Sequence, residues 1–136
     1  MTARDLQVGQ QIEPFVIESV DAERMKTMAA ILQDPNPIHF DTEATRALGM
    51  GDKPVNQGPI NLTWLMESVM RFAGGPEALV SVKLRFLGNV FGGERFECTG
   101  TVTSVDSEAG EAQLELSATA DGRPALSGVA VVAITG

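Results

Sequence analysis

The sequence predicts an α+β fold in which an antiparallel β-sheet wraps around one long, central apolar helix. Residues 59–72 are apolar over most of a helical surface, which is typical of a buried helix. From residue 79 onward, apolar and polar residues alternate with the period of a β-strand. Turn-forming residues separate the alternating segments, and Asp121-Gly122 favours a tight hairpin. The 136 residues are predicted to form one domain over 1–136, long enough to bury a core.

The first third of the chain is predicted to hold one strand and two short helices. An opening strand is expected over residues 9–20, where Phe15 and Ile17 would share one face. Asp21 is a typical N-cap for a helix over 22–32, which a proline loop ends. The second helix is expected over 43–48, capped by Asp41 or Thr42 and ended by Gly49.

Four strands are predicted in the second half, at residues 79–87, 93–104, 111–120 and 125–134. They are long for so short a chain, so the sheet is expected to keep an open edge and one incompletely covered end. Pairing with a second copy is therefore expected.

The composition excludes several classes of function. A formal net charge of −8 and a pI of about 4.5 argue against a nucleic-acid partner, because phosphate binding needs a clustered positive face. No apolar stretch reaches the ~20 residues that span a bilayer, and the N-terminus lacks a signal core, so a soluble cytoplasmic protein is expected. Cys98 is the only cysteine, which excludes an internal disulfide and a multi-cysteine zinc site.

The stretch from Asp34 to Asp41 is the most informative segment. It contains His39, the only histidine in the chain, five positions after Asp34. Pro35 and Pro37 lie between them and disfavour a helix, so the segment is predicted to be a stiff loop that holds an acid and a base together.

Other interpretations of these residues are weaker. A lone histidine is more often a surface or core residue, but the two prolines and the spaced aspartate favour a site here. A metal site with Asp34, His39 and Asp41 is not expected, because Asp41 is better explained as a helix cap. Cys98 lies in an alternating strand and is expected to pack in the core, and no Gly-x-Ser-x-Gly elbow is present.

The motif Asp34-Pro-Asn-Pro-Ile-His39-Phe-Asp41, followed by a short helix ending at Gly49, a loop to Gly58 and a long apolar helix, resembles the MaoC-like hydratase/dehydratase branch of the hotdog fold. The motif is similar to that of (R)-specific enoyl-CoA hydratase 2. The resemblance implies a hotdog fold and an enzyme that hydrates 2-enoyl-CoA or dehydrates (R)-3-hydroxyacyl-CoA. Its substrate would be a coenzyme A thioester, and it would need no separate cofactor or metal.

The sequence departs from the family pattern at two places. Many members have Ser-Gly where this chain has Leu32-Gln33, and many have histidine where it has Gln57. The region around Asn56 and the long helix is similar to small MaoC-like subunits that act on bulky steroid side-chain thioesters, some of which work only with a second MaoC-like chain. Both a homodimer and a hetero-oligomer therefore stay open.

Hydration of a conjugated thioester needs a base, an acid and hydrogen-bond donors for the developing enolate oxygen. Asp34 and His39 are the candidates for the first two roles. The backbone N–H of Gly58, at the start of the apolar helix, is the candidate enolate donor, although it also fits an ordinary helix-entry glycine. Asn36 is expected to brace the loop or orient His39, unless it is simply a turn residue.

Coenzyme A phosphates would need basic residues at the mouth of the site, although each candidate also fits an ordinary solvated charge. The candidates are Lys53, Lys83, Arg85 and Arg95. The sequence leaves two other functions open, a subunit whose site a partner completes and a hotdog thioesterase that uses Asp34. It does not distinguish acyl identity, the direction of reaction, or coenzyme A from acyl carrier protein.

Overall fold

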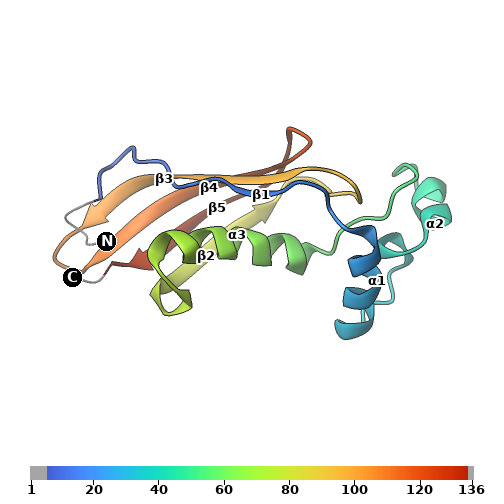
Figure 1. The fold of residues 1–136 in the computed structure, drawn as a ribbon, viewed down its shortest axis with the longest axis horizontal. Helices are drawn as coiled ribbons and strands as arrows, with labels where there is room; N and C mark the ends of the chain where they lie inside the picture. Colours follow the sequence, from blue (N-terminus) through green and yellow to red (C-terminus); the bar gives the residue numbers. More distant parts are fainter. Residues whose placement is uncertain (1–5, 135–136) are drawn as a thin grey trace.

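The computed structural model describes residues 6–134, which form a five-stranded antiparallel sheet with a long helix along one face (Figure 1). The strands are β1 (Phe15–Ile17), β2 (Leu79–Phe86), β3 (Phe96–Asp106), β4 (Glu111–Ala120) and β5 (Arg123–Ala133). The helices are α1 (Ala22–Ile31), α2 (Thr42–Ala47) and α3 (Gly58–Ala73), with short 3-10 turns η2 (Pro37–His39) and η3 (Pro76–Ala78). The strand order is β1-β3-β4-β5-β2. The predicted α+β class is therefore confirmed.

Local signals place most element ends close to their predicted positions. The Asp21 and Asp41 carboxylates cap α1 and α2 by accepting hydrogen bonds from backbone N–H groups two residues on, both at 2.9 Å. Helix α3 ends at Gly74, which adopts the left-handed conformation with φ of 99°. The β4–β5 hairpin turns at Asp121-Gly122, with φ of 46° and 80°.

The predicted opening strand over residues 9–20 is wrong in its extent, because only Phe15–Ile17 pairs as a regular strand. Pro14 has no N–H to give to a ladder, so regular pairing begins only after it. The earlier residues still follow β3, and the Ile12 N–H donates to the Gly100 carbonyl at 3.0 Å. β3 also begins later than predicted, at Phe96, since Gly92 and Gly93 form a turn before it.

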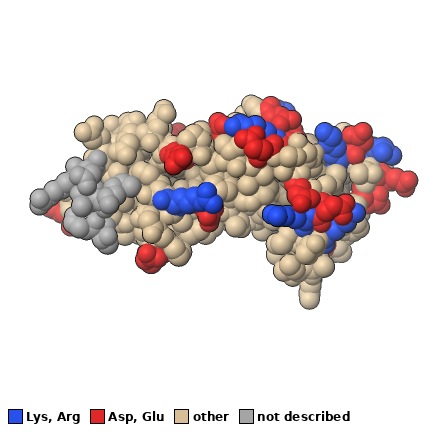
Figure 2. Space-filling view, viewed as in Figure 1, with Lys and Arg blue, Asp and Glu red and all other residues tan. Residues whose placement is uncertain are grey.

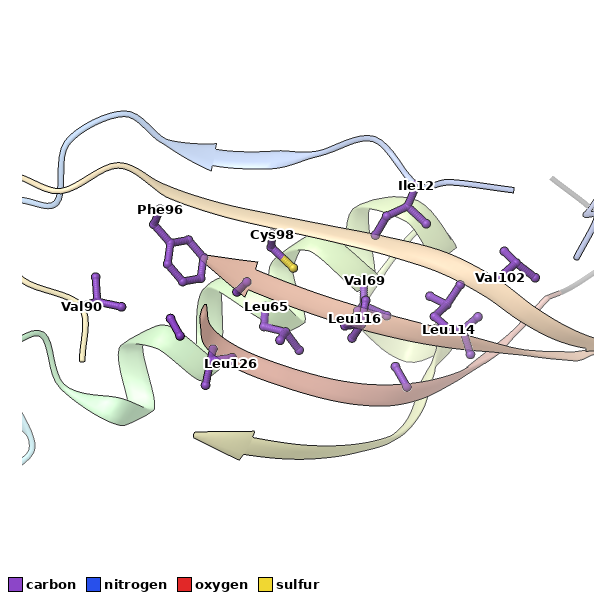
Figure 3. Close-up of a cluster of buried hydrophobic side chains, with 14 of the residues drawn as sticks. Ile12, Leu65, Val69, Val90, Phe96, Cys98, Val102, Leu114, Leu116 and Leu126 are labelled. Atoms are coloured by element: carbon purple, nitrogen blue, oxygen red, sulfur yellow. The ribbon is translucent and has the colours of Figure 1, made fainter. Parts of the chain in front are cut away.

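The core lies between α3 and the inner face of the sheet (Figure 3). Leu65 and Val69 of α3 are fully buried against Phe96, Leu114 and Leu116 of the central strands. In β4, every second residue is buried, as the alternating pattern predicts. Cys98 is also buried in this cluster, which agrees with its predicted packing role.

The sequence of α3 predicts a buried helix. In the structure, however, the single chain covers only one of its sides. Leu62 and Met66 lie beside the edge strand β2 and, with residues of that strand, line an open groove of about 610 Å³. Val80 and Phe86 of β2 are 53% and 55% exposed. The expected open edge is thus present at β2. Across residues 6–134, no helix has the length and apolar character needed to cross a membrane.

Candidate active site

Asp34 is positioned by the end of α1. Gln33 adopts a positive φ of 51° there, and the Asp34 N–H then donates to the Ala29 carbonyl at 2.9 Å. This bond closes the last turn of α1 and turns the chain away from the helix axis. The Asp34 carboxylate is consequently fixed relative to α1.

The proline loop is stabilised by two side-chain caps in series. Oδ1 of Asp34 accepts a hydrogen bond from the Asn36 N–H at 3.0 Å, and Oδ1 of Asn36 accepts one from the Ile38 N–H at 3.2 Å. The Asn36 side chain therefore caps η2, the turn that carries His39. Its bond goes to the backbone of the turn, so it braces the loop and reaches the ring of His39 only through that turn.

The loop brings His39 and Asp34 together. Nε2 of His39 lies 3.1 Å from Oδ2 of Asp34, and Nδ1 of His39 lies 2.6 Å from the Val55 carbonyl oxygen. Because a carbonyl can only accept, Nδ1 must carry a hydrogen. Nε2 is then the ring nitrogen that faces the Asp34 carboxylate. The ring is buried, whereas the Asp34 side chain is 32% exposed, so the pair is accessible from the carboxylate side.

Val55 contacts the Asp34–His39 pair through its backbone, which the sequence did not indicate. Its carbonyl orients the His39 ring, and its N–H donates to the Ile38 carbonyl at 2.8 Å, so the two segments are joined in both directions. Both contacts use backbone atoms, which any residue type except proline would supply at this position. No sequence pattern could therefore have identified it.

Gly58 is the first residue of α3, so its N–H has no acceptor within the helix. The next residue is Pro59, which has no N–H at all. A Cβ at Gly58 would stand 3.3 Å from Cε1 of Phe86, closer than most such contacts. The close approach of this ring already favours glycine here, and the role of the Gly58 N–H as an enolate donor stays a prediction.

Gln57 connects α1 to the start of α3. It is fully buried, and its Nε2 donates to the Met25 carbonyl at 2.8 Å. Its Oε1 is buried without a hydrogen-bond partner among the described residues. The only sequence signal for this role was that many similar proteins have histidine at this position. Through Gln57, the helix that ends near Asp34 is joined to the helix that begins at Gly58.

The predicted coenzyme A residues do not come together. Lys53 borders a small hollow with Phe91, Glu94 and Asp121, whereas Lys83 and Arg85 lie on β2 beside the outward-facing residues of β5. Arg95 pairs with Glu97 at 2.8 Å and with Glu18 at 3.4 Å. Figure 2 shows acidic and basic side chains intermixed on the visible face around α1 and α2. The assignment of these residues to phosphates remains a prediction.

A second cavity, of about 480 Å³, lies between α1, α3 and the connection from β1 to α1. Met28, Ile60 and Trp64 form much of its apolar wall, and Asn56 also lines it. Neither Asp34 nor His39 borders it. The described residues contain no group of three or more His, Cys, Asp or Glu side chains that could hold a metal ion.

Comparisons with known proteins agree on one family and one fold. Residues 5–121 match the family described as MaoC like domain. The structure is similar to an (R)-hydratase from A. caviae involved in PHA biosynthesis, with 22% identity and a TM-score of 0.84 over 97% of this chain and 99% of that one. It is also similar to R-hydratase PhaJ1 from Pseudomonas aeruginosa, with 18% identity and a TM-score of 0.82 over 98% and 84%.

A third similar structure is the ChsH1-ChsH2 complex from Mycobacterium tuberculosis, with 16% identity and a TM-score of 0.80 over 95% of this chain and 98% of that one. No curated protein matches the sequence significantly. At these identities, the structural likenesses establish the fold. They confirm the predicted β-sheet that wraps around a long helix.

Proposed function

The chain belongs to the MaoC-like domain family, and from this premise we propose that it adds water to 2-enoyl thioesters or removes it from (R)-3-hydroxyacyl thioesters. The observation that carries the proposal is the 3.1 Å approach of His39 Nε2 to Asp34 Oδ2, with the ring oriented by the Val55 carbonyl. Two of the similar structures are R-hydratases by name, which supports the same reaction. The substrate would be carried as a coenzyme A thioester, without a separate cofactor.

In the proposed reaction, one water binds at the exposed side of the Asp34–His39 pair. The pair removes a proton from the water while its oxygen bonds to the β-carbon of the substrate. Electrons of the double bond move toward the thioester carbonyl, whose oxygen becomes an enolate. The pair then returns a proton to the α-carbon on the same face, which gives syn addition. Because the two side chains are in direct contact, the proton transfers are assigned to the pair and to neither residue alone.

The enolate oxygen is assigned to the N–H of Gly58. This donor has no acceptor in α3, and it lies at the positive end of a 16-residue helix. A donor that is already oriented stabilises the charge as it develops, without reorganisation. Asn36 contributes by holding η2, and Gln57 by joining α3 to α1.

The test is to follow the loss of enoyl absorbance from a 2-enoyl-CoA series together with the release of free thiol. Asp34→Asn and His39→Ala are each expected to lower hydration by about 10²–10⁴-fold, the range typical of general acid–base groups. Circular dichroism of each variant controls for folding. Hydration that survives both substitutions would falsify the assignment of the site. Thiol release without hydration would indicate a thioesterase instead.

We also propose that the chain works as an assembly with a second chain, either a copy of itself or another MaoC-like chain. Strand β2 is an edge strand with exposed apolar side chains, and one similar structure is a complex of two different chains by name. Activity of the purified chain alone would support the homomeric form. Activity that requires a second MaoC-like protein would support the heteromeric one.

A further inference from the structure

We propose that Glu94 is a positioning residue that acts on His39 through the backbone. Glu94 fixes the β2–β3 connection (residues 87–95), and this connection holds the segment whose carbonyl orients the His39 ring. The proposal rests on the function proposed above, because an effect on catalysis requires that His39 take part in the reaction. Three observations carry it: the burial of the Glu94 carboxylate, its bonds within the connection, and the bonds from the connection to the segment around Val55.

The Glu94 side chain is a buried carboxylate held by three hydrogen bonds. The residue is 6% exposed, and its Oε2 and Oε1 accept from Nη1 and Nη2 of Arg123 at 2.6 Å and 2.9 Å. Oε1 also accepts from the Phe91 N–H at 2.7 Å. A buried charge is costly to remove from water, and a buried ion pair commonly adds little net stability. Fixed local geometry is therefore the better explanation for a carboxylate at this position.

The carboxylate gives the β2–β3 connection its shape. The Phe91 N–H donates to the Glu94 side chain, and the Glu94 N–H donates to the Phe91 carbonyl at 3.2 Å, so the two residues close a tight turn. Arg123, the first residue of β5, also donates from Nη2 to the Asn89 carbonyl at 3.4 Å. The turn is thereby attached to the sheet at the start of β5.

The same connection pairs with residues 54–56 as two very short antiparallel strands do. Val55 forms an isolated bridge with Phe91, and a backbone hydrogen bond lies on each side of this bridge. The two bonds run from the Gly92 N–H to the Pro54 carbonyl at 2.9 Å and from the Asn56 N–H to the Val90 carbonyl at 2.7 Å. Residues 54–56 are therefore placed by a turn that Glu94 holds.

Val55 transmits this restraint to the site. Its carbonyl accepts from Nδ1 of His39 at 2.6 Å, and its N–H donates to the Ile38 carbonyl at 2.8 Å. The neighbouring Asn56 side chain donates from Nδ2 to Oδ1 of Asn61 at 2.7 Å, which joins the segment to the start of α3 as well. A displacement of the β2–β3 connection should consequently move the His39 ring, and a small displacement of a reacting group is enough to slow a reaction.

The test compares Glu94→Ala and Glu94→Gln with the parent protein in the hydration of crotonyl-CoA. Glu94→Ala removes the acceptor of the Phe91 N–H and the partner of Arg123, and it should lower kcat by about 10- to 100-fold. KM should change little, because Glu94 acts on the ring and not on the substrate. Glu94→Gln keeps an oxygen for the Phe91 N–H and should recover much of the loss. Circular dichroism gives the folded fraction by which each kcat is corrected.

Glu97→Ala is the matched control. It also removes a carboxylate that accepts from an arginine, here from Nη1 of Arg95 at 2.8 Å, and Glu97 lies only three residues further along the chain. The neighbours of Glu97 across the sheet are Val16 in β1 and Thr119 in β4, away from the pairing with residues 54–56. This variant should keep the parental kcat.

The His39 ring offers a second readout, which does not depend on activity. Because His39 is the only histidine, protein labelled with isotopic histidine gives imidazole NMR signals from this ring alone. The hydrogen on Nδ1 should exchange slowly with water in the parent protein, since it lies in a buried bond of 2.6 Å. Its signal should shift or broaden in folded Glu94→Ala and stay unchanged in Glu97→Ala. General destabilisation would not alter the signal of molecules that remain folded.

Parental kcat and an unchanged ring signal in Glu94→Ala, while Asp34→Asn still abolishes hydration, would overturn the inference and leave the proposed function standing. A loss of kcat that Glu97→Ala shares equally would also overturn it, since the effect would then come from stability alone. If the parent protein does not hydrate enoyl-CoA, the proposed function fails, and the ring signal still decides whether Glu94 positions His39.

Discussion

At the scale of single residues, the geometry of the candidate site depends on which nitrogen of His39 already makes a hydrogen bond to the backbone. Nδ1 must donate to the Val55 carbonyl, which leaves Nε2 to face Asp34. A lone histidine on a mobile loop would sample several ring orientations. Here the ring is buried and the loop is bonded on both sides of Asn36, so the pair is oriented before substrate arrives.

Asn36 provides the first prediction at this scale. Asn36→Ala removes the cap of η2 and should lower the free energy of unfolding by about 0.5–2 kcal/mol, the usual cost of losing such a cap. It should also lower kcat more than it raises KM, because the turn holds His39 and not the substrate. Asn36→Asp keeps an oxygen at the capping position and is the control. Steady-state kinetics and denaturant titration check both, and equal kcat in all three proteins would contradict the bracing role.

Cys98 provides a second residue-scale prediction, on pH. Burial in the core raises the pKa of the Cys98 thiol, and a contact with Ser68 offsets part of the rise. A raised pKa means that the folded state keeps its proton when the unfolded thiol ionises. The stabilisation is therefore complete below the pKa of an unfolded thiol, about 8.5, and is lost as pH rises above it.

The free energy of unfolding of the parent protein should consequently fall more steeply above pH 8.5 than that of Cys98→Ala, by up to about 1.4 kcal/mol per pH unit. Urea titrations between pH 7 and 10 measure both slopes. Rapid alkylation of the folded protein by iodoacetamide at pH 7.5 would contradict the buried, protonated thiol.

At the scale of elements, the site is formed by two helices that meet through Gln57. Asp34 lies three residues after the end of α1 and bonds back to it through the Ala29 carbonyl, and Gly58 is the first residue of α3. The bond from Gln57 to the Met25 carbonyl joins them across 32 positions of sequence. The relative position of the Asp34 carboxylate and the Gly58 N–H therefore depends in part on the bond from the Gln57 side chain to the Met25 carbonyl.

Gln57→Leu tests this connection. The substitution keeps the approximate shape but leaves the Met25 carbonyl buried without its donor, which should cost about 1–3 kcal/mol of unfolding free energy. It should also lower kcat, because α1 is freed from α3. Thr63→Val, which removes an exposed bond within α3 alone, is the control and should stay within about 0.5 kcal/mol. A Gln57→Leu protein with parental stability and kcat would refute the role.

Elements set by local chemistry could be predicted from the sequence. The residues of β4 alternate regularly, and its bounds are the predicted ones; the Asp121-Gly122 turn has the positive φ values that its residue types allow. The Asp34–His39 pair was predictable because two prolines restrict the backbone conformation between the acid and the base. The orienting carbonyl of Val55 and the Phe86–Gly58 contact were not, since both depend on segments that only the tertiary fold brings together.

At the scale of the whole molecule, the single chain leaves one side of its sheet and helix uncovered. The sheet ends at β2, where backbone groups on the outer side have no neighbouring strand among the described residues. The apolar pattern of α3 predicted a buried helix, and its partial exposure in the single chain has a simple physical explanation. Residues such as Leu62 and Met66 have the composition of an interface, and a second chain at the β2 edge would cover them.

Val80→Lys tests the assembly. Val80 is 53% exposed on β2, so a charge there should be tolerated by the fold but should oppose pairing along this edge. The parent protein is expected to have the mass of a dimer by light scattering, and the variant should shift toward the monomer with unchanged circular dichroism. Val8→Lys adds the same charge at a position that is 67% exposed and lies before β1, so it should leave the mass unchanged. If Val80→Lys keeps the parental mass, the β2 edge is not the interface, and the apolar side of α3 must be covered in another way.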